Sequence, residues 1–168
     1  MNRRTLLTRV VQAFSAIAGM AVLFPFVRSV IPTYEERTLE VDIGDLGLDE
    51  SKRVLWQGRT VIIRRYRSGQ PGIGQKQALK DPDSTASIQP VFAANEHRSR
   101  QPDLFVAYAN CTHLGCEVVE SQEGFSSPCH QSHFDHAGRV FADAAATRNL
   151  DVPHYRFLAR HVLLLEAS

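Results

Sequence analysis

The residues between positions 111 and 134 place the strongest constraint on this chain. They include all three of its cysteines and three of its seven histidines. These residues form two short boxes, Cys-Thr-His-Leu-Gly-Cys at 111–116 and Ser-Pro-Cys-His-Gln-Ser at 127–132. Two Cys/His boxes in loop-like sequence, about 15 residues apart, are the usual layout for holding a metal centre between two turns. A tetrahedral zinc site would use paired C-x-x-C or H-x-x-x-H steps instead. The spacing therefore favours two loops that meet around a metal centre of another kind.

The two boxes resemble those of the Rieske iron–sulfur proteins, whose second box is usually written C-P-C-H-G-S. In that family two cysteines bind one iron of a [2Fe–2S] cluster and two histidines bind the other. Two further cysteines form a disulfide that ties the loops together. The resemblance implies that Cys111, His113 and His130 are cluster ligands, that Ser127 stands at the fourth ligand position, and that Cys116 and Cys129 form the disulfide.

The second box departs from the family at several positions. Ser127 replaces a cysteine, and a hydroxyl is a harder and less acidic ligand than a thiol. Gln131 replaces a glycine and Phe134 replaces a tyrosine, whereas Ser132 is retained and could donate a hydrogen bond to a cluster sulfur. The loop at 143–147, which covers the cluster in the family, contains no proline. Two functions therefore stay open: an electron carrier, or a cluster-free membrane-anchored protein with a structural or assembly role.

Segments outside the boxes also resemble one branch of the family. Trp-Gln-Gly-Arg-Thr-Val-Ile-Ile-Arg-Arg at 56–65 and Leu-Lys-Asp-Pro at 79–82 are similar to the iron–sulfur subunit of ubiquinol–cytochrome c reductase. That resemblance implies that His113 or His130 accepts a proton from ubiquinol while one electron enters the cluster and passes to a c-type haem. It also implies cytochrome b and cytochrome c-type subunits as partners. The net charge of +1 gives no indication of nucleic-acid binding.

The N-terminus predicts a membrane anchor over residues 1–30. An uncharged run of 18 residues, 10–27, follows Arg3, Arg4 and Arg9. As a helix it would span roughly 27 Å, close to the ~30 Å hydrocarbon core of a bilayer. The order Arg-Arg-Thr-Leu-Leu resembles a twin-arginine export signal, and no A-x-A-like cleavage site follows the apolar run. We therefore expect an uncleaved single-pass anchor in a bacterial inner membrane, with the rest of the chain on the periplasmic side.

The remainder of the chain predicts an all-β head. Residues 31–38 are expected to form a hinge or tether, and residues 39–168 a Rieske-like domain with a cluster-binding subdomain at about 110–134. Strict alternation at 39–43 predicts a half-buried strand, and apolar runs at 53–56 and 60–65 flank Gln-Gly-Arg as in a hairpin. Further strands are expected at 104–109 and 161–166. These strands should form two antiparallel sheets, with the two boxes meeting at one tip.

Overall fold

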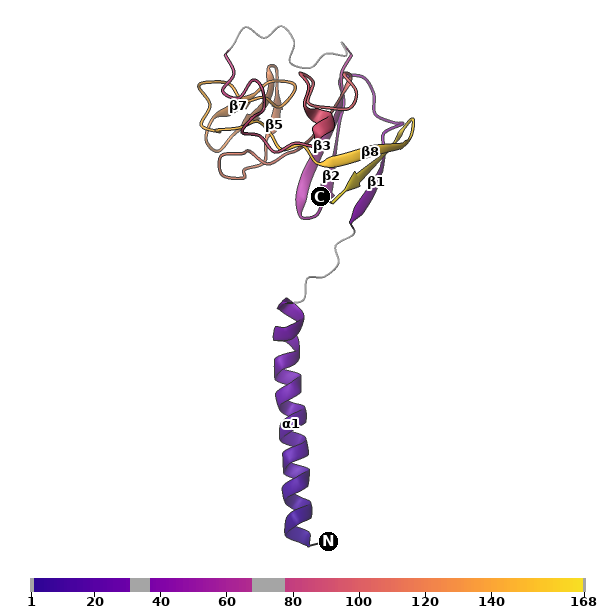
Figure 1. Cartoon of the computed structure of the whole chain (residues 1–168), viewed down its shortest axis with the longest axis vertical. Coiled ribbons are helices and arrows are strands. Elements are labelled where there is room, and N and C mark those ends of the chain that lie inside the picture. The colour runs from indigo at the N-terminus through magenta and orange to yellow at the C-terminus, as the bar shows by residue number, and fades with distance from the viewer. Residues whose placement is uncertain (1, 31–36, 68–77, 168) are drawn as a thin grey trace. The chain divides into compact units, whose positions relative to one another are not determined.

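The computed structural model describes residues 2–30, 37–67 and 78–167. The chain divides into two compact units, Met1–Glu35 and Glu36–Ser168, and the second is called the head below (Figure 1). Most of the tether expected at 31–38 lies outside the described residues. The two units are therefore considered separately.

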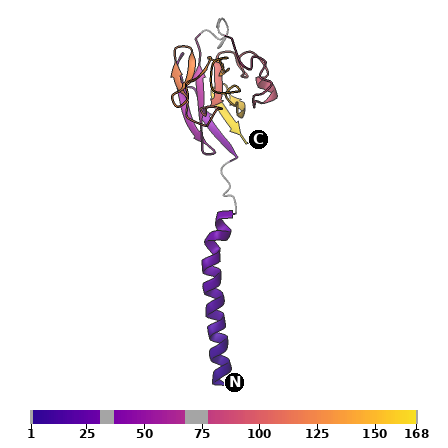
Figure 2. The ribbon, with the colours of Figure 1, turned by 90° about the vertical axis from the view of Figure 1, so that its left-hand side faces the viewer.

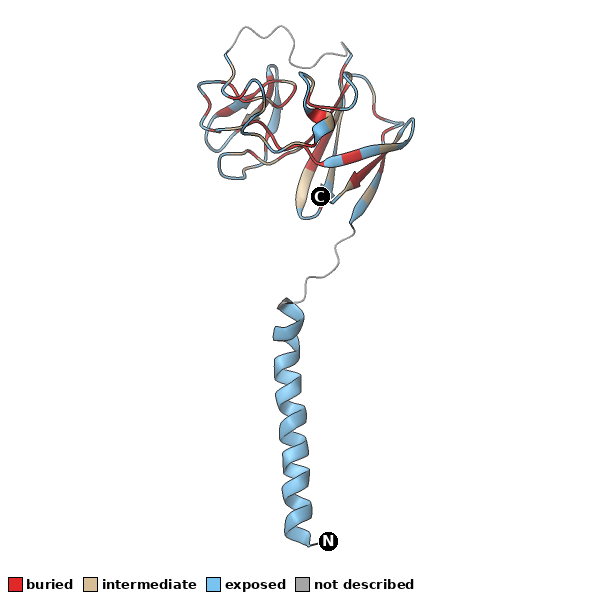
Figure 3. Ribbon diagram, viewed as in Figure 1, coloured by how far each residue is buried: buried red, intermediate tan, exposed pale blue. Residues whose placement is uncertain are grey.

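The first unit is a single helix, α1 (Arg3–Val30), which continues through Pro25. Its stretch Arg3–Ser29 has a mean hydropathy of 2.0, and none of its most apolar window is buried within the protein. In Figure 3 the described helix is exposed on every side. A helix that is apolar all round needs an apolar environment, and this one is long enough to cross a bilayer.

The head is built from antiparallel strands, as the alternating sequence predicts. The described residues form three three-stranded sheets rather than the two expected, because the region of the second box makes a small sheet of its own. The strands, in sheet order, are β1 (Thr38–Asp42), β9 (Val162–Glu166) and β8 (His154–Ala159); β2 (Ser51–Trp56), β3 (Arg59–Arg65) and β4 (Leu104–Tyr108); and β5 (Val119–Ser121), β6 (Gly124–Ser127) and β7 (Ser132–Phe134). A short 3-10 helix, η1 (Val91–Ala93), precedes β4.

The β2–β3 hairpin forms where the sequence predicts it. Its two turn residues, Gln57 and Gly58, have φ of 49° and 71°. Two consecutive left-handed residues are the mark of a type I′ turn, whose twist matches that of the flanking strands. Trp56 ends β2 and is 4% exposed, so it is a core residue.

The sheet β2–β3–β4 is the central layer of the head. Val61 and Ile63 pack in a core cluster with residues of β1 and β9, whereas Ile62 between them packs in a second cluster with Phe125 and Phe134. Successive strand residues point to opposite faces, so a strand covered on both sides reads as a continuous apolar run. In Figure 1 the labels β5 and β7 lie on one side of β2 and β3, and β1 and β8 lie on the other. Figure 2 shows the orange and yellow parts of the head on opposite sides of the same strands.

The small sheet β5–β6–β7 contains a close backbone contact between the start of β6 and the end of β7. Gly124 has φ of +137°, and a Cβ atom built on it would lie 2.3 Å from the carbonyl carbon of Asp135. No side chain fits there, so a glycine is required. Phe125 of β6 pairs with Phe134 of β7, and both rings are fully buried.

A buried arginine connects the loops behind this subdomain. Arg98 has no solvent exposure and donates to the backbone carbonyls of Ala137, Gly138 and Leu150 at 2.7–3.3 Å. Burial lowers its pKa to about 10, and nearby carboxylates, Asp135 first among them, oppose that effect. The guanidinium thus links the backbone at 137–138 to that at Leu150 through three carbonyls.

Candidate metal centre

The first box is a tight turn at the end of β4. The N–H of Gly115 donates to the carbonyl of Cys111 at 2.8 Å, and the N–H of Cys111 donates to the carbonyl of Cys116 at 2.7 Å. Gly115 has φ of +80°, a left-handed conformation in which glycine carries no steric cost. The turn therefore returns the chain sharply after Cys111 and presents His113 and Leu114 at the surface.

The second box is the hairpin loop between β6 and β7. Ser127 closes β6 opposite Ser132 of β7, so residues 128–131 form the connection. Gln131 has φ of 51°, the left-handed region that disfavours a side chain by roughly 1–2 kcal/mol. This explains in backbone terms why the family places a glycine there. The Gln131 side chain is exposed and does not fill the site.

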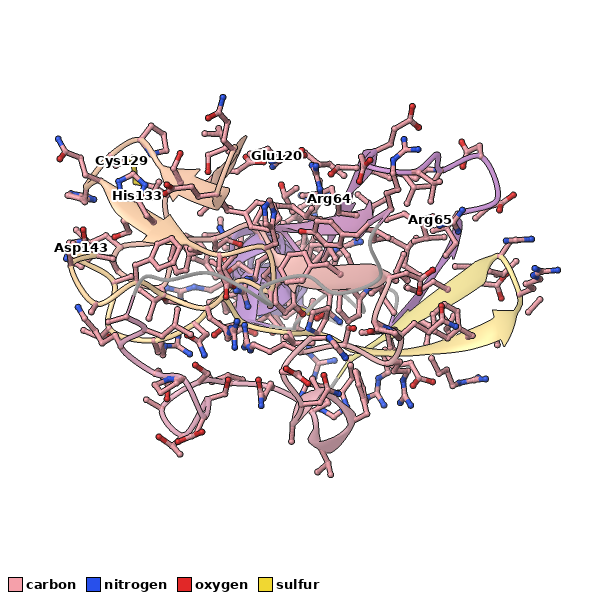
Figure 4. The ribbon with its side chains drawn as sticks, turned by 90° about the horizontal axis from the view of Figure 1, so that it is seen from above. Arg64, Arg65, Glu120, Cys129, His133 and Asp143 are labelled. Atoms are coloured by element: carbon pink, nitrogen blue, oxygen red, sulfur yellow. A yellow bond between two sulfur atoms is a disulfide. The ribbon has the colours of Figure 1, made fainter. Side chains whose placement is uncertain are left out.

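The two boxes meet, as the sequence predicts. Cys116 and Cys129 form a disulfide with Cα atoms 6.5 Å apart, which confirms the pairing implied by the resemblance. The rings of His113 and His130 face each other edge to face, with centroids 4.8 Å apart. In Figure 4 the labelled Cys129 and His133 lie together at one end of the head. Residues from loops 17 positions apart in sequence, 113 and 130, are therefore neighbours in space.

The four residues at ligand positions divide into a buried pair and an exposed pair. Cys111 is 2% exposed and is a free cysteine, and Ser127 is 1% exposed. His113 and His130 are exposed. The sulfur and hydroxyl thus face the protein interior, while both imidazoles are open to solvent or to a partner.

The fit of these residues to a [2Fe–2S] cluster depends on Ser127. Within the described residues, its buried Oγ is one of four buried polar side-chain atoms without a hydrogen-bond partner, and of these four Ser127 alone belongs to one of the two boxes. A buried hydroxyl normally has a partner, so an isolated one requires an explanation such as a bound ion or cofactor. With a thiol at 111 and two adjacent imidazoles, the donor set fits the group, with an oxygen in place of one sulfur.

Ser132 and the loop at 143–147, the cover loop, form the wall behind the second box. The Ser132 Oγ accepts a hydrogen bond from the Ala146 N–H at 2.9 Å, and its own hydroxyl hydrogen is left to donate elsewhere. Ala144 and Ala146 are buried, at 4% and 0% exposure, so small apolar side chains replace prolines as packing. Asp143, at the start of this loop, is labelled near Cys129 and His133 in Figure 4.

Two contacts to the cover region were not expected from the sequence. The Lys80 ammonium donates to the carbonyls of Ala144 at 2.6 Å and Ala146 at 3.0 Å. The Thr112 hydroxyl, inside the first box, donates to the carbonyl of Arg148 at 2.6 Å. Lys80 belongs to a segment singled out only for its resemblance, and no local pattern predicts where its side chain reaches.

Phe134 and four other histidines, His133, His136, His154 and His161, occupy packing or surface positions. Phe134 is fully buried in the second core cluster and has no hydroxyl with which to bond a sulfur. His133, His154 and His161 are exposed, and His136 is half-buried with its ring edge-on to Tyr66.

Comparison with known proteins defines the class. The Rieske [2Fe–2S] domain model matches residues 44–156, which is more than half of the chain. The chain belongs to the Rieske family.

Two relatives resemble this chain over nearly its full length. The ubiquinol–cytochrome c reductase iron–sulfur subunit of Allochromatium vinosum is 32% identical over 181 residues, covering 97% of this chain and 87% of that protein. The subunit of the same name from Blastochloris viridis is 31% identical over 164 residues, covering 94% and 88%. A chain of a hyperthermophilic respiratory Complex III structure aligns with a TM-score of 0.49 and 20% identity, over 93% of this chain and 98% of that one.

These relatives confirm the branch of the family that the sequence predicts. The Rieske iron–sulfur subunit of the cytochrome bc1 complex is the protein type that this chain resembles, and a cluster-free role is not favoured. The apolar N-terminal helix is consistent with a single-pass membrane anchor. The assignment of individual cluster ligands stays a prediction.

Proposed function

We propose that this chain is the electron-carrying subunit of a quinol–cytochrome c oxidoreductase, transferring electrons from ubiquinol to a c-type cytochrome. The observation that carries the proposal is the meeting of the two boxes. Two exposed imidazoles lie 4.8 Å apart next to a buried free thiol, and a disulfide joins the loops. The membership of the family and the two near full-length relatives support it.

Cys111 and Ser127 would hold the inner iron of a [2Fe–2S] cluster, and His113 and His130 the outer one. When bound, such a cluster supplies reversible one-electron chemistry, at a potential that histidine ligation places at roughly −150 to +300 mV. Ser127 contributes its otherwise unpartnered Oγ. Ser132 contributes a hydroxyl hydrogen, because its oxygen already accepts from Ala146.

In this proposal an exposed imidazole accepts the proton that the quinol releases on oxidation. A quinol hydroxyl bound in a neighbouring membrane subunit hydrogen-bonds to His113 or His130. As the quinol loses an electron, the imidazole takes the hydroxyl proton and later releases it to solvent. Imidazole suits this role because its ring nitrogens can both accept and donate a proton. The buried Cys111 and Ser127 keep water away from the inner side of the site.

The anchor and partners follow from the same proposal. α1 spans a bacterial inner membrane with its N-terminus in the cytoplasm and the head in the periplasm. Cytochrome b presents the quinol, and a cytochrome c-type subunit receives the electron. The Cys116–Cys129 disulfide is consistent with an oxidising compartment.

Iron content and the electron paramagnetic resonance spectrum of dithionite-reduced protein test the proposal. Wild type, Ser127→Cys and Ser127→Ala are purified side by side from cells with the same iron supply. We expect retained iron and the reduced-state signal to fall in the order Ser127→Cys, wild type, Ser127→Ala. The physical reason is that a thiolate suits iron–sulfide chemistry better than a hydroxyl, and a methyl group offers no ligand.

The cysteine variant is the decisive one. It restores the family's two-cysteine, two-histidine set and should approach about two irons per chain. If it carries no iron while its disulfide and fold are intact, the electron-carrier proposal fails. A wild type that already holds two irons with a stable signal would instead establish serine ligation.

A further inference from the structure

A second site lies beside the first box. A pocket of about 350 Å³ has one wall made by the first box, residues 111–115, and an opposite polar wall made by Arg59, Asn110, Arg148 and Asp151. Arg59, Arg148 and Asp151 stand outside both boxes and take no part in the proposed cluster site. The proposed cluster site therefore does not explain why these three side chains lie together.

One carboxylate in this pocket serves two guanidinium groups. Asp151 Oδ1 pairs with Arg148 Nη1 at 2.6 Å, and Asp151 Oδ2 pairs with Arg59 Nη2 at 3.4 Å. The Asp151 side chain is 10% exposed, whereas those of Arg148 and Arg59 are 28% and 39% exposed. The cluster of two arginines and one aspartate carries a net charge of +1, with its negative member the most deeply buried.

Most of the guanidinium N–H donors of Arg59 and Arg148 have no hydrogen-bond acceptor within the described residues. A guanidinium has five N–H donors. Arg59 uses one on Asn110 Oδ1 at 3.2 Å and one on Asp151, and Arg148 uses one on Asp151. Within the described part of the chain, the other guanidinium N–H groups of these two residues meet no acceptor. A positive pocket with unused planar donors matches an oxyanion, which guanidinium groups bind in a bidentate manner.

Arg59 is held in place before any ligand arrives. Its guanidinium carbon lies 3.6 Å from the centre of the Tyr108 ring. That ring stacks in turn on Trp56, with an interplanar angle of 5°. Trp56 is a buried core residue of the central sheet. A cation fixed on a rigid platform loses little entropy on binding, which favours recognition over a flexible surface charge.

We propose that this pocket is a binding site for an oxyanion, a carboxylate or a phosphate group. Arg148 and Arg59 grip the anion with the donors that Asp151 leaves free. Asp151 keeps the two side chains oriented without cancelling their charge. The anion would be held by Arg59 and Arg148, neither of which is a proposed cluster ligand, so the proposal does not require that the Ser127 position binds iron.

The test uses the full-length, iron-free protein in detergent at fixed ionic strength. Isothermal titration with inorganic phosphate and, separately, with succinate should show saturable binding of at least one of them. Arg59→Gln and Arg148→Gln should each weaken it by about tenfold or more, since a charge-assisted hydrogen bond contributes roughly 1.5–3 kcal/mol. The matched control is Arg156→Gln, which removes the same charge from an exposed ion pair with Glu166 and should bind like wild type.

Amide NMR shifts locate the anion in the wild type, so the proposal stays testable if a variant fails to fold. Addition of the anion should move the amide signals of Thr112 and Arg148 at concentrations that leave Arg156 unchanged. The ligand that titrates distinguishes a phosphate from a carboxylate site. Absence of saturable binding for both anions, or equal binding by wild type and both arginine variants, would overturn the proposal. Neither result bears on iron content, so this test and that of the electron carrier fail independently.

Discussion

At the scale of single residues, His136 is a side chain whose charged form the fold disfavours. Burial lowers its pKa below 6.5, and the Arg64 charge lowers the pKa further. The Asp135 carboxylate and a backbone hydrogen bond with Gln122 raise the pKa, but by less. The folded protein therefore binds fewer protons than the unfolded chain in this range. Its contribution to stability is fully present above the unfolded pKa of about 6.5 and is lost as pH falls through the lower folded pKa.

We expect a measurable consequence in the pH dependence of unfolding. Between about pH 7.5 and pH 5 the thermal midpoint of wild type should fall more steeply than that of His136→Gln, which lacks the titrating group. The slopes are compared rather than the absolute values, because the substitution also removes the ring contact with Tyr66 at every pH. His154→Gln, at an exposed position on β8, is the control and should keep the wild-type slope. Equal slopes in all three proteins would exclude His136 as the source.

At the scale of elements, the cover loop depends on a contact from a distant segment. Lys80 precedes the buried Asp81, whose pKa stays low despite burial because it accepts hydrogen bonds from Ser87 and Thr85. The backbone of 78–80 lies against 140–142, with the Lys80 N–H donating to the carbonyl of Val140. This pairing places the ammonium over the carbonyls of Ala144 and Ala146. These two hydrogen bonds from Lys80, called the clamp below, restrain the cover loop, which in the family contains prolines.

Removing the clamp should loosen the cover loop more than the rest of the head. In Lys80→Met we expect hydrogen exchange of the Ala146 amide, which is bonded to Ser132, to quicken by about tenfold or more, as the loss of charge-assisted hydrogen bonds implies. Lys80→Arg should restore much of the protection. Lys52→Met, which removes an ion pair with Asp45, is the control and should leave Ala146 unchanged. Unaltered exchange in Lys80→Met would show that the alanine packing alone holds the loop.

At the scale of the whole molecule, the charges around α1 predict its orientation. Arg3, Arg4 and Arg9 precede the uncharged run, and positive residues favour the cytoplasmic side. A reporter that works only in the periplasm, fused after Ser168, should therefore be active. Replacing Arg3 and Arg4 by lysine should reduce its activity if export uses the twin-arginine route, while Arg28→Lys, at the other end of α1, should not. Activity only from a cytoplasmic reporter would contradict the orientation.

The sequence alone determined the features whose information is local. A run of 18 uncharged residues specifies an apolar helix, and Gln57-Gly58 between β-branched segments specifies a hairpin. The two boxes identified the family, and through it the Cys116–Cys129 disulfide. In each case a few residues that are neighbours in sequence are enough to specify the feature, such as a left-handed turn or an apolar surface.

The tertiary structure decided what depends on distant partners. The isolation of the Ser127 hydroxyl and the burial of β3 on both faces follow from packing between segments far apart in sequence. Lys80 meets Ala144 across 64 positions, and Arg59 meets Asp151 across 92. The sequence around a long, flexible side chain does not predict which group accepts its hydrogen bond. The position of that acceptor is fixed only when the sheets have assembled. The sequence therefore identified the residues of the candidate metal centre, while the clamp on its cover loop and the arginine pocket beside it depended on the tertiary structure.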